Sequence, residues 1–392
     1  METFYDAIKI KGKDKTGLNN IIEKRLIKLR ESVFHDKEDK SEYGIDTLMV
    51  LIEENRRYLS GFTGEDTQFD ESAGALFINK DRFILATDSR FTEQAEKEAP
   101  MFEIVCYKEG LAKELPEILQ KMGTKKLGFE TIRMTYYQYK KISEQFDLKN
   151  LDIELIETEN LVENFRVCKD ITEMQKIRNA ISVAESVFTD VTGRLEPGMT
   201  ESKIAWDIEK GMREAGAESC SFATIVASGP NSAMPHAIPG NRKIKNGEPV
   251  LIDWGAKIDD YCSDTTRTIV LGEPEDRFKK VYMAVYDAQR MAIDAVKPGV
   301  SSKKIDSIAR NHINKKGFEG KFGHGLGHGI GLAVHEPPRV GPLKDTIIEE
   351  GMVFTIEPGI YIPGWGGIRL ENMVEVQKEG AEVLNNLGFY KF

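Results

Sequence analysis

The carboxyl-terminal half of the sequence repeats one arrangement of elements, and this repeat constrains the fold more than any other feature. Residues 195–200 (LEPGMT) and 296–301 (VKPGVS) each carry a Pro-Gly pair followed by one apolar residue and then Thr or Ser. A helical pattern of apolar residues precedes each copy, and another follows at 201–215 and 302–315. One such match would carry little weight, because Pro-Gly before a Ser/Thr cap is a common helix connection. Since the elements recur in the same order, we predict an internally duplicated domain.

The length of 392 residues exceeds what one hydrophobic core usually organises, so we predict two domains, residues 1–165 and 166–392. Near the start of the second, Asp170 and Glu173 have the spacing of a helix-capping box. In the first, a polar tail precedes an amphipathic helix, and short β-branched or aromatic runs then alternate with polar turns. The expected helix spans residues 21–33, and the expected strands span 45–52, 74–78 and 83–87. The first domain should therefore be a mixed α/β domain.

Composition excludes several classes of protein. The net charge of -10 and the lack of a dense Lys/Arg stripe argue against nucleic acid or an anionic membrane surface as a partner. No apolar run approaches the roughly 20 residues that span a bilayer, and residues 1–20 lack the apolar core of a signal peptide. The four cysteines are scattered, without zinc-ribbon spacing, and are predicted to be reduced and structural. We expect a cytoplasmic protein, with His35 on its surface.

Four carboxylates lie in strand-like apolar runs, where an isolated charge is costly: Asp253, Asp264, Glu357 and Glu371. Each of them taken alone is as well explained by an arginine partner or by a turn that it caps as by a metal. Arg267 and Arg369 could neutralise two at most. A metal cluster is the economical way to hold the others.

Histidines and glycines are concentrated in the segment between Asp264 and Glu357. His324 and His328 lie in the glycine-rich stretch 323–331, and His335 follows it. His236 is a further candidate from the first half, whereas His312 lies mid-helix and reads as structural or solvated. A glycine-rich stretch can cradle phosphate, but this one lacks the Walker lysine. No Ser or Cys nucleophile stands in a recognisable elbow, so metal-activated water is the better candidate nucleophile.

Several separated motifs together resemble the M24 metallopeptidases, and within them an Xaa-Pro aminopeptidase or a prolidase. In the second half these are DWGA at 253–256, DTTR at 264–267, GHGLGH at 323–328, TIEPG at 355–359 and RLEN at 369–372. In the first half, NRRYLSGF at 55–62 and DSR at 88–90 are similar to the creatinase-type amino-terminal domain of that family. The resemblance implies an α/β (α+β) fold whose pita-bread catalytic domain is duplicated about a pseudo-two-fold axis, plus a smaller α/β domain.

The resemblance also implies the site. Asp253 would bind one divalent metal ion, Asp264 and Glu371 would bridge two, and His328 with Glu357 would complete the other. An oxygen-rich set with one imidazole favours Mn²⁺, with Co²⁺, Zn²⁺ and Fe²⁺ as alternatives. Three further roles follow from the same resemblance. Glu357 would also move a proton, His236 and His335 would stabilise the tetrahedral intermediate or hold the substrate, and His324 and Arg369 would orient ligands and substrate. Arg369 could equally be only a charge partner for Glu371.

We therefore expect a metallo-aminopeptidase that cleaves the bond between an amino-terminal residue and proline at the second position. The alternative is an Xaa-Pro dipeptidase, a prolidase, which must recognise the free carboxylate of its substrate. A remoter alternative is a non-catalytic binding or scaffold relative, which is disfavoured because all five ligand positions are filled. A methionine aminopeptidase would normally lack the first domain. The family further suggests a homodimer.

Overall fold

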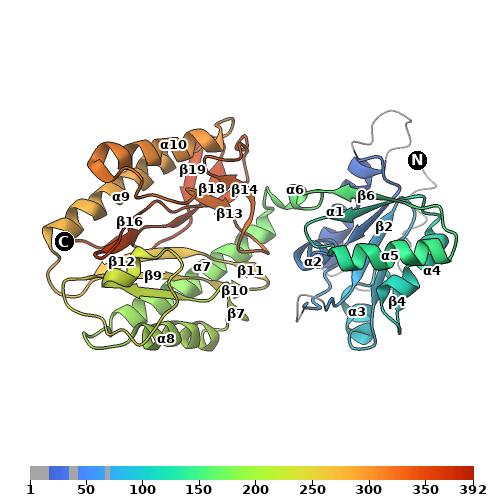
Figure 1. Cartoon of the computed structure of the whole chain (residues 1–392), viewed down its shortest axis with the longest axis horizontal. Coiled ribbons are helices and arrows are strands. Elements are labelled where there is room, and N and C mark those ends of the chain that lie inside the picture. Colours follow the sequence, from blue (N-terminus) through green and yellow to red (C-terminus); the bar gives the residue numbers. More distant parts are fainter. Residues whose placement is uncertain (1–16, 35–42, 67–70) are drawn as a thin grey trace. The chain divides into compact units, whose positions relative to one another are not determined.

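The computed structural model describes residues 17–34, 43–66 and 71–392. These form two compact units, Met1–Phe165 and Arg166–Phe392, which are described separately (Figure 1). The predicted polar tail up to residue 16 and His35 lie outside the described residues. Among the described helices, none is both long enough and apolar enough to cross a bilayer.

The first unit is built on a mixed six-stranded sheet with the order β4-β3-β2-β1-β5-β6. Apolar side chains from the strands meet α4 and α5 in one buried cluster that includes Phe77, Leu119 and Phe129. The predicted helix 21–33 and the three predicted strands are all present, as α1 and β1 to β3. The strands are β1 (Thr47–Val50), β2 (Ala75–Asn79), β3 (Phe83–Thr87), β4 (Glu103–Cys106), β5 (Lys126–Glu130) and β6 (Glu154–Thr158). The helices are α1 (Gly17–Val33), α2 (Glu53–Ser60), α3 (Thr92–Glu98), α4 (Leu111–Met122) and α5 (Tyr136–Leu148).

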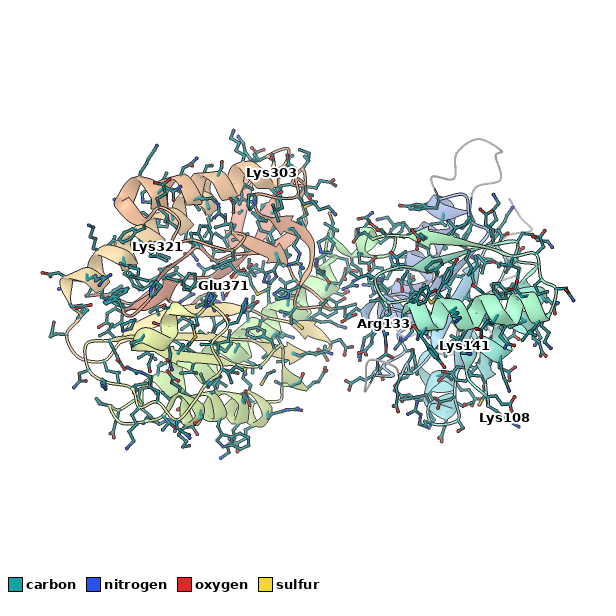
Figure 2. All side chains as sticks on the ribbon, in the orientation of Figure 1. Lys108, Arg133, Lys141, Lys303, Lys321 and Glu371 are labelled. Carbon is teal, nitrogen blue, oxygen red and sulfur yellow. The ribbon has the colours of Figure 1, made fainter. Side chains whose placement is uncertain are left out.

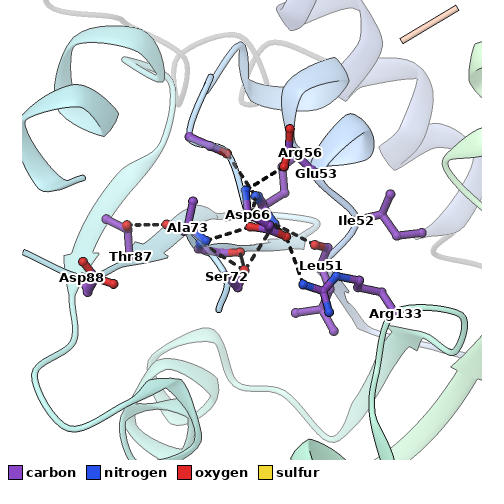
Figure 3. Close-up of polar contacts among 12 residues, drawn as sticks. Leu51, Ile52, Glu53, Arg56, Asp66, Ser72, Ala73, Thr87, Asp88 and Arg133 are labelled. Carbon is purple, nitrogen blue, oxygen red and sulfur yellow. Dashed lines mark hydrogen bonds and ion pairs between the residues drawn. The ribbon is translucent and has the colours of Figure 1, made fainter. Parts of the chain in front are cut away.

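In the first unit, an ion-pair network joins Arg56 of α2 to Asp66 and Arg133 (Figure 3). The carboxylate of Asp66 accepts hydrogen bonds from Arg56 at 2.7 Å, from Arg133 at 3.2 Å and from the backbone N–H of Ala73 at 2.8 Å. Arg56 is fully buried and also donates to the carbonyls of Leu51 and Gly64. Because Asp66 neutralises Arg56, the buried guanidinium is not left as an isolated charge.

The second unit packs two helix pairs around antiparallel strands; in Figure 1, α7 and α8 lie on one side of the strands and α9 and α10 on the other. The helices are α7 (Ile171–Thr192), α8 (Glu201–Glu214), α9 (Asp276–Asp294) and α10 (Ser302–Ile313), with the short α6 (Glu163–Arg166) before them. Four small sheets have the orders β12-β9-β8, β14-β13-β15-β18-β19, β16-β17 and β11-β10-β7. Their strands are β7 (Ser219–Cys220), β8 (Ile225–Ser228), β9 (Pro249–Trp254), β10 (Ala256–Ile258), β11 (Tyr261–Cys262), β12 (Thr265–Val270), β13 (Gly327–Gly329), β14 (Glu336–Val340), β15 (Val353–Ile356), β16 (Gly359–Ile362), β17 (Gly366–Arg369), β18 (Asn372–Gln377) and β19 (Gly380–Val383).

The predicted duplication is confirmed by matching hydrogen bonds in the two halves. Gly198 donates to the carbonyl of Ile244 at 2.9 Å, and Gly299 donates to that of Ile348 at 2.8 Å. Both glycines have a positive φ, 97° and 86°, which glycine adopts without steric cost. The two helices that follow are N-capped by Thr200 and Ser301, as the sequence pattern required. The two halves therefore repeat the same turn and helix cap, and strands or strand ends of both halves carry the candidate site.

Candidate metal centre

The four predicted carboxylates lie at strand ends or breaks in the second unit. Asp253 is in β9, and Asp264 immediately precedes β12, its antiparallel neighbour. Glu357 follows the last residue of β15, and Glu371 lies between β17 and β18. Figure 2 labels Glu371 in the interior of this unit. The two halves of the duplication thus each contribute two carboxylates to one region.

A triad of ligand atoms from Asp264, His328 and Glu371 lies within 4.8 Å of one another, and all three residues are buried. The His328 Nε2 atom is 3.6 Å from Asp264 Oδ2 and 3.4 Å from Glu357 Oε1. The other ring nitrogen of His328, Nδ1, donates to the carbonyl of Gly329 at 3.1 Å. This hydrogen bond fixes the tautomer, so the Nε2 lone pair faces the carboxylates as a metal ligand would.

Burial makes the charged carboxylates expensive without a cation. Burial and the neighbouring acids raise the pKa of both Asp264 and Glu371 well above their ordinary values. Burial raises the pKa of Glu357 to about 8. Conversely, burial lowers the pKa of His328 to about 3, so its imidazole is neutral and free to bind a metal.

Only one of the two nearby arginines neutralises a predicted ligand. Arg369 is fully enclosed and binds Asp253, with 2.5 Å between Nη2 and Oδ2. The direct ion-pair partner of Arg369 is thus Asp253, while the charge of Glu371 also acts on this guanidinium. Arg267, which the sequence offered as a second partner, instead donates to the backbone carbonyls of Thr266 and Glu371 and to the side chain of Asn372. No acidic side chain of the described residues forms an ion pair with Arg267.

The remaining polar atoms fit a divalent metal. Asp253 Oδ1 and Asp264 Oδ1 are buried and have no hydrogen-bond partner among the described residues. Buried carboxylate oxygens are ordinarily satisfied, so two such atoms fit a site that binds a cation. A set of carboxylates with one histidine is suited to hard or borderline divalent ions.

Hydroxyl groups that the sequence analysis missed hold these carboxylates. Thr266 donates to Glu371 at 2.7 Å, and Thr355 donates to Glu357 at 3.2 Å. The hydroxyl of Tyr361 accepts from Arg369 at 2.9 Å and contacts the Nε2 atom of His324 at 2.9 Å. Since His324 Nδ1 donates to the Gly325 carbonyl, Tyr361 is the donor to His324. Both threonines lie inside the motifs 264–267 and 355–359, which was the available signal; Tyr361 had none.

The other predicted histidines are not part of the buried cluster. His335 is exposed, with its ring 4.1 Å from the His328 ring, edge to face. His236 is exposed on the loop before β9, and its charge acts on both His324 and His335. His324 is half-buried, and burial lowers its pKa to about 4. His312 is half-buried on α10 near Asp287, away from the cluster, as the sequence indicated.

An exposed arginine that the sequence analysis passed over stands beside the cluster. Arg339 in β14 is the direct cross-strand partner of His328 in β13. Cross-strand partners project from the same face of a sheet, so Arg339 lies on the side of His328 that carries the carboxylates. Its positive charge acts on His328, His335 and Glu357. Among the described residues, it forms no ion pair.

Comparison with known proteins gives consistent matches along the chain. The model of metallopeptidase family M24 matches residues 175–378, and the creatinase/prolidase amino-terminal domain matches residues 38–168. A solved Xaa-Pro dipeptidase from Bacillus anthracis superposes with a TM-score of 0.86 at 38% identity, covering 94% of this chain and 99% of that one. An X-Pro aminopeptidase from Thermotoga maritima superposes with a TM-score of 0.79 at 38% identity, covering 90% and 98%. An Xaa-Pro dipeptidase from Pyrococcus furiosus is 35% identical over 88% of this chain and 94% of its own.

Proposed function

Because this chain belongs to metallopeptidase family M24 and is a hydrolase, we propose that it is an Xaa-Pro dipeptidase, which cleaves dipeptides that end in proline. The sequence alone led us to expect an aminopeptidase first and a prolidase second. The similar proteins include several dipeptidases and two aminopeptidases, which supports the dipeptidase interpretation. We therefore reverse that order.

The observation that carries the proposal is the position of the Arg339 guanidinium, which lies beside the candidate metal centre without an ion-pair partner among the described residues. In an Xaa-Pro dipeptide the free carboxylate is attached to the proline, close to the scissile bond. Arg339 lies opposite His328 and has no ion-pair partner among the described residues. A guanidinium binds a carboxylate in a bidentate manner, so Arg339 is placed to recognise the end of a dipeptide. A longer peptide has no charge at that position.

Divalent metal ions are implied by the family, and two Mn²⁺ ions are our specific proposal for this site. Asp253 would hold one ion, His328 and Glu357 the other, and Asp264 and Glu371 both. When bound, the ions would acidify water and polarise the scissile carbonyl. Manganese, a homodimer and a cytoplasmic location stay predictions of the resemblance.

The chain's own groups would supply the remaining steps. Glu357, held by Thr355, is placed to accept a proton and return it to the leaving proline nitrogen. His335 and His236 are exposed beside the buried cluster and can donate to substrate oxygens. Arg369 and Tyr361 connect Asp253 with His324, so they fix the orientation of these two side chains.

The experiment that tests the proposal compares Ala-Pro with Ala-Pro-Ala, using metal-stripped protein resupplied with Mn²⁺. A dipeptidase should cleave Ala-Pro with a kcat/KM at least about tenfold above that for the tripeptide, which corresponds to one charge-assisted contact. Preference for the tripeptide would support the second candidate, an Xaa-Pro aminopeptidase, which the likeness to the Thermotoga maritima structure favours. Failure to cleave either peptide with metal bound would reject both.

Replacing Arg339 by methionine should raise the KM for Ala-Pro by about 10- to 100-fold, because a charge-assisted hydrogen bond to the substrate carboxylate is lost. The kcat/KM for Ala-Pro-Ala should stay within about threefold, and Arg339→Lys should recover part of the dipeptide activity. Steady-state kinetics with both substrates measure this. Arg290→Met, on α9, is the matched control for loss of an arginine. An equal loss on both substrates would show that Arg339 does not read the carboxylate.

A further inference from the structure

Two ligand-bearing segments leave one sheet and enter another at the same level. The ladder between β15 and β18 ends where Ile356 faces Asn372, and the ladder between β16 and β17 begins where Gly359 faces Arg369. Glu357 lies in the first gap and Glu371 in the second. Between the two ladders, the segments are joined by one long backbone hydrogen bond, from Leu370 to the Pro358 carbonyl at 3.4 Å. The backbone ladder is thus weakest beside the two carboxylates.

One side chain from α9 bridges the two segments at this point. The Gln289 Nε2 group donates to the carbonyl of Ile356 at 3.0 Å and to the carbonyl of Leu370 at 2.9 Å. Each of these residues immediately precedes a predicted ligand, Glu357 or Glu371. Gln289 is fully buried, so neither hydrogen bond competes with solvent.

The oxygen of the Gln289 amide indicates that the NH₂ group is the part of the side chain that makes the contacts at this position. Its Oε1 atom is buried and has no partner among the described residues, which is an unfavourable arrangement for a core side chain. The reversed amide would place oxygen against two carbonyl oxygens, so the orientation is fixed. A leucine or methionine would fill the same space without an unsatisfied oxygen. A packing role alone therefore does not account for a glutamine here.

We propose that Gln289 is a positioning residue of the metal centre, whose single amide group sets the spacing between Glu357 and Glu371. The inference rests on the dinuclear site of the proposed function. Glu371 would also bind the ion assigned to His328 and Glu357, so both glutamates of that ion would come from the bridged segments. The ion assigned to Asp253 would have only Glu371 from them. Loss of the Gln289 bridge should therefore weaken binding of the ion assigned to His328 and Glu357 more than binding of the ion assigned to Asp253.

The test is calorimetric titration of metal-stripped protein with Mn²⁺, which needs no catalytic turnover. Gln289→Met keeps the length and apolar bulk of the side chain but removes the donor. It should weaken one of the two binding steps by about tenfold or more and change the other by less than about threefold. Gln289→Asn keeps the amide but is one methylene shorter and cannot reach both carbonyls, so it should show a smaller loss at the same step.

Val285→Ala is the matched control, since Val285 is buried on the same helix and has no hydrogen-bonding side chain. It should lower the unfolding temperature while leaving both Mn²⁺ affinities within about threefold of wild type. Equal weakening in this control, or unchanged binding in both Gln289 variants, would overturn the proposal, as would wild-type protein that binds fewer than two ions. Wild type that binds two ions but does not cleave Xaa-Pro peptides would reject the proposed substrate and leave the positioning role standing.

Discussion

Asp264→Asn is expected to lower the kcat/KM for Ala-Pro by roughly a thousandfold, about 4 kcal/mol of transition-state stabilisation, and to abolish stoichiometric metal binding. The reason is geometric, because Asp264 belongs to the buried triad with His328 and Glu371 and carries an unsatisfied oxygen. The amide cannot supply the negative charge that balances a divalent ion. Steady-state kinetics and metal analysis after dialysis measure the two effects.

The same substitution should stabilise the metal-free protein, which separates it from a folding defect. Burial and the charges of Glu371, Asp253 and Glu357 all raise the pKa of Asp264, so its ionised form is unfavourable without a cation. Asp264→Asn should therefore raise the unfolding temperature of metal-stripped protein. Asp287→Asn, a partly exposed carboxylate of the same unit, should change neither activity nor metal content. Normal activity of Asp264→Asn would contradict the assignment of this residue as a ligand.

Glu336→Gln is expected to lower the free energy of unfolding of the second unit by about 3–5 kcal/mol, because it removes the buried negative charge that Arg166 and Lys169 share. Glu336 forms ion pairs with Arg166 and, at 2.7 Å, with Lys169, and all three side chains are nearly inaccessible. For a unit of this size the unfolding temperature should fall by roughly 10 °C. Thermal or urea unfolding at pH 7 measures the effect, and Glu382→Gln, which removes an exposed partner of Arg178, should cost less than about 1 kcal/mol.

The pH dependence of this difference follows from the sign of the shift. Burial raises the pKa of Glu336, but Lys169 and Arg166 outweigh it, so the folded-state pKa lies below the ordinary value of 4.5. The ion pairs therefore contribute fully above the unfolded-state pKa, and their contribution is lost as the pH falls through the folded-state pKa. The gap between wild type and Glu336→Gln should be constant above about pH 5.5 and shrink below it. A gap that widened in acid would contradict the assignment.

The features that could be predicted from the sequence are those that depend on short local patterns of residues. Pro-Gly turns with Ser/Thr caps predicted the duplication, and the position of carboxylates at the ends of apolar runs was enough to identify Asp253, Asp264, Glu357 and Glu371. Their proximity arises because the fold brings together strands far apart in sequence: Thr266 and Glu371 are hydrogen-bonded across 105 positions, and Thr268 and Arg369 across 101. Local patterns could therefore name these candidates.

The groups that the sequence missed act through long-range contacts. Glu336 meets Arg166 across 170 positions, and Gln289 meets Ile356 and Leu370 across 67 and 81. No local pattern marks such partners, because in the sequence a buried glutamine cannot be distinguished from a polar residue on the exposed face of a helix. Arg339 was hidden for the same reason, because its position opposite His328 depends on strand register. The sequence allowed Arg267 to neutralise one of the carboxylates, whereas in the structure this guanidinium donates mainly to backbone carbonyls, which no sequence pattern marks.

We propose that the carboxylates and His328 form a dinuclear metal centre that hydrolyses Xaa-Pro bonds. The most direct test of this claim is to titrate metal-stripped protein with Mn²⁺ and follow Ala-Pro hydrolysis at each addition. We predict no hydrolysis without metal, and a rate that rises until two equivalents per chain are bound and then stays level. Hydrolysis that persists in fully stripped protein, or two bound equivalents without any hydrolysis, would contradict the claim.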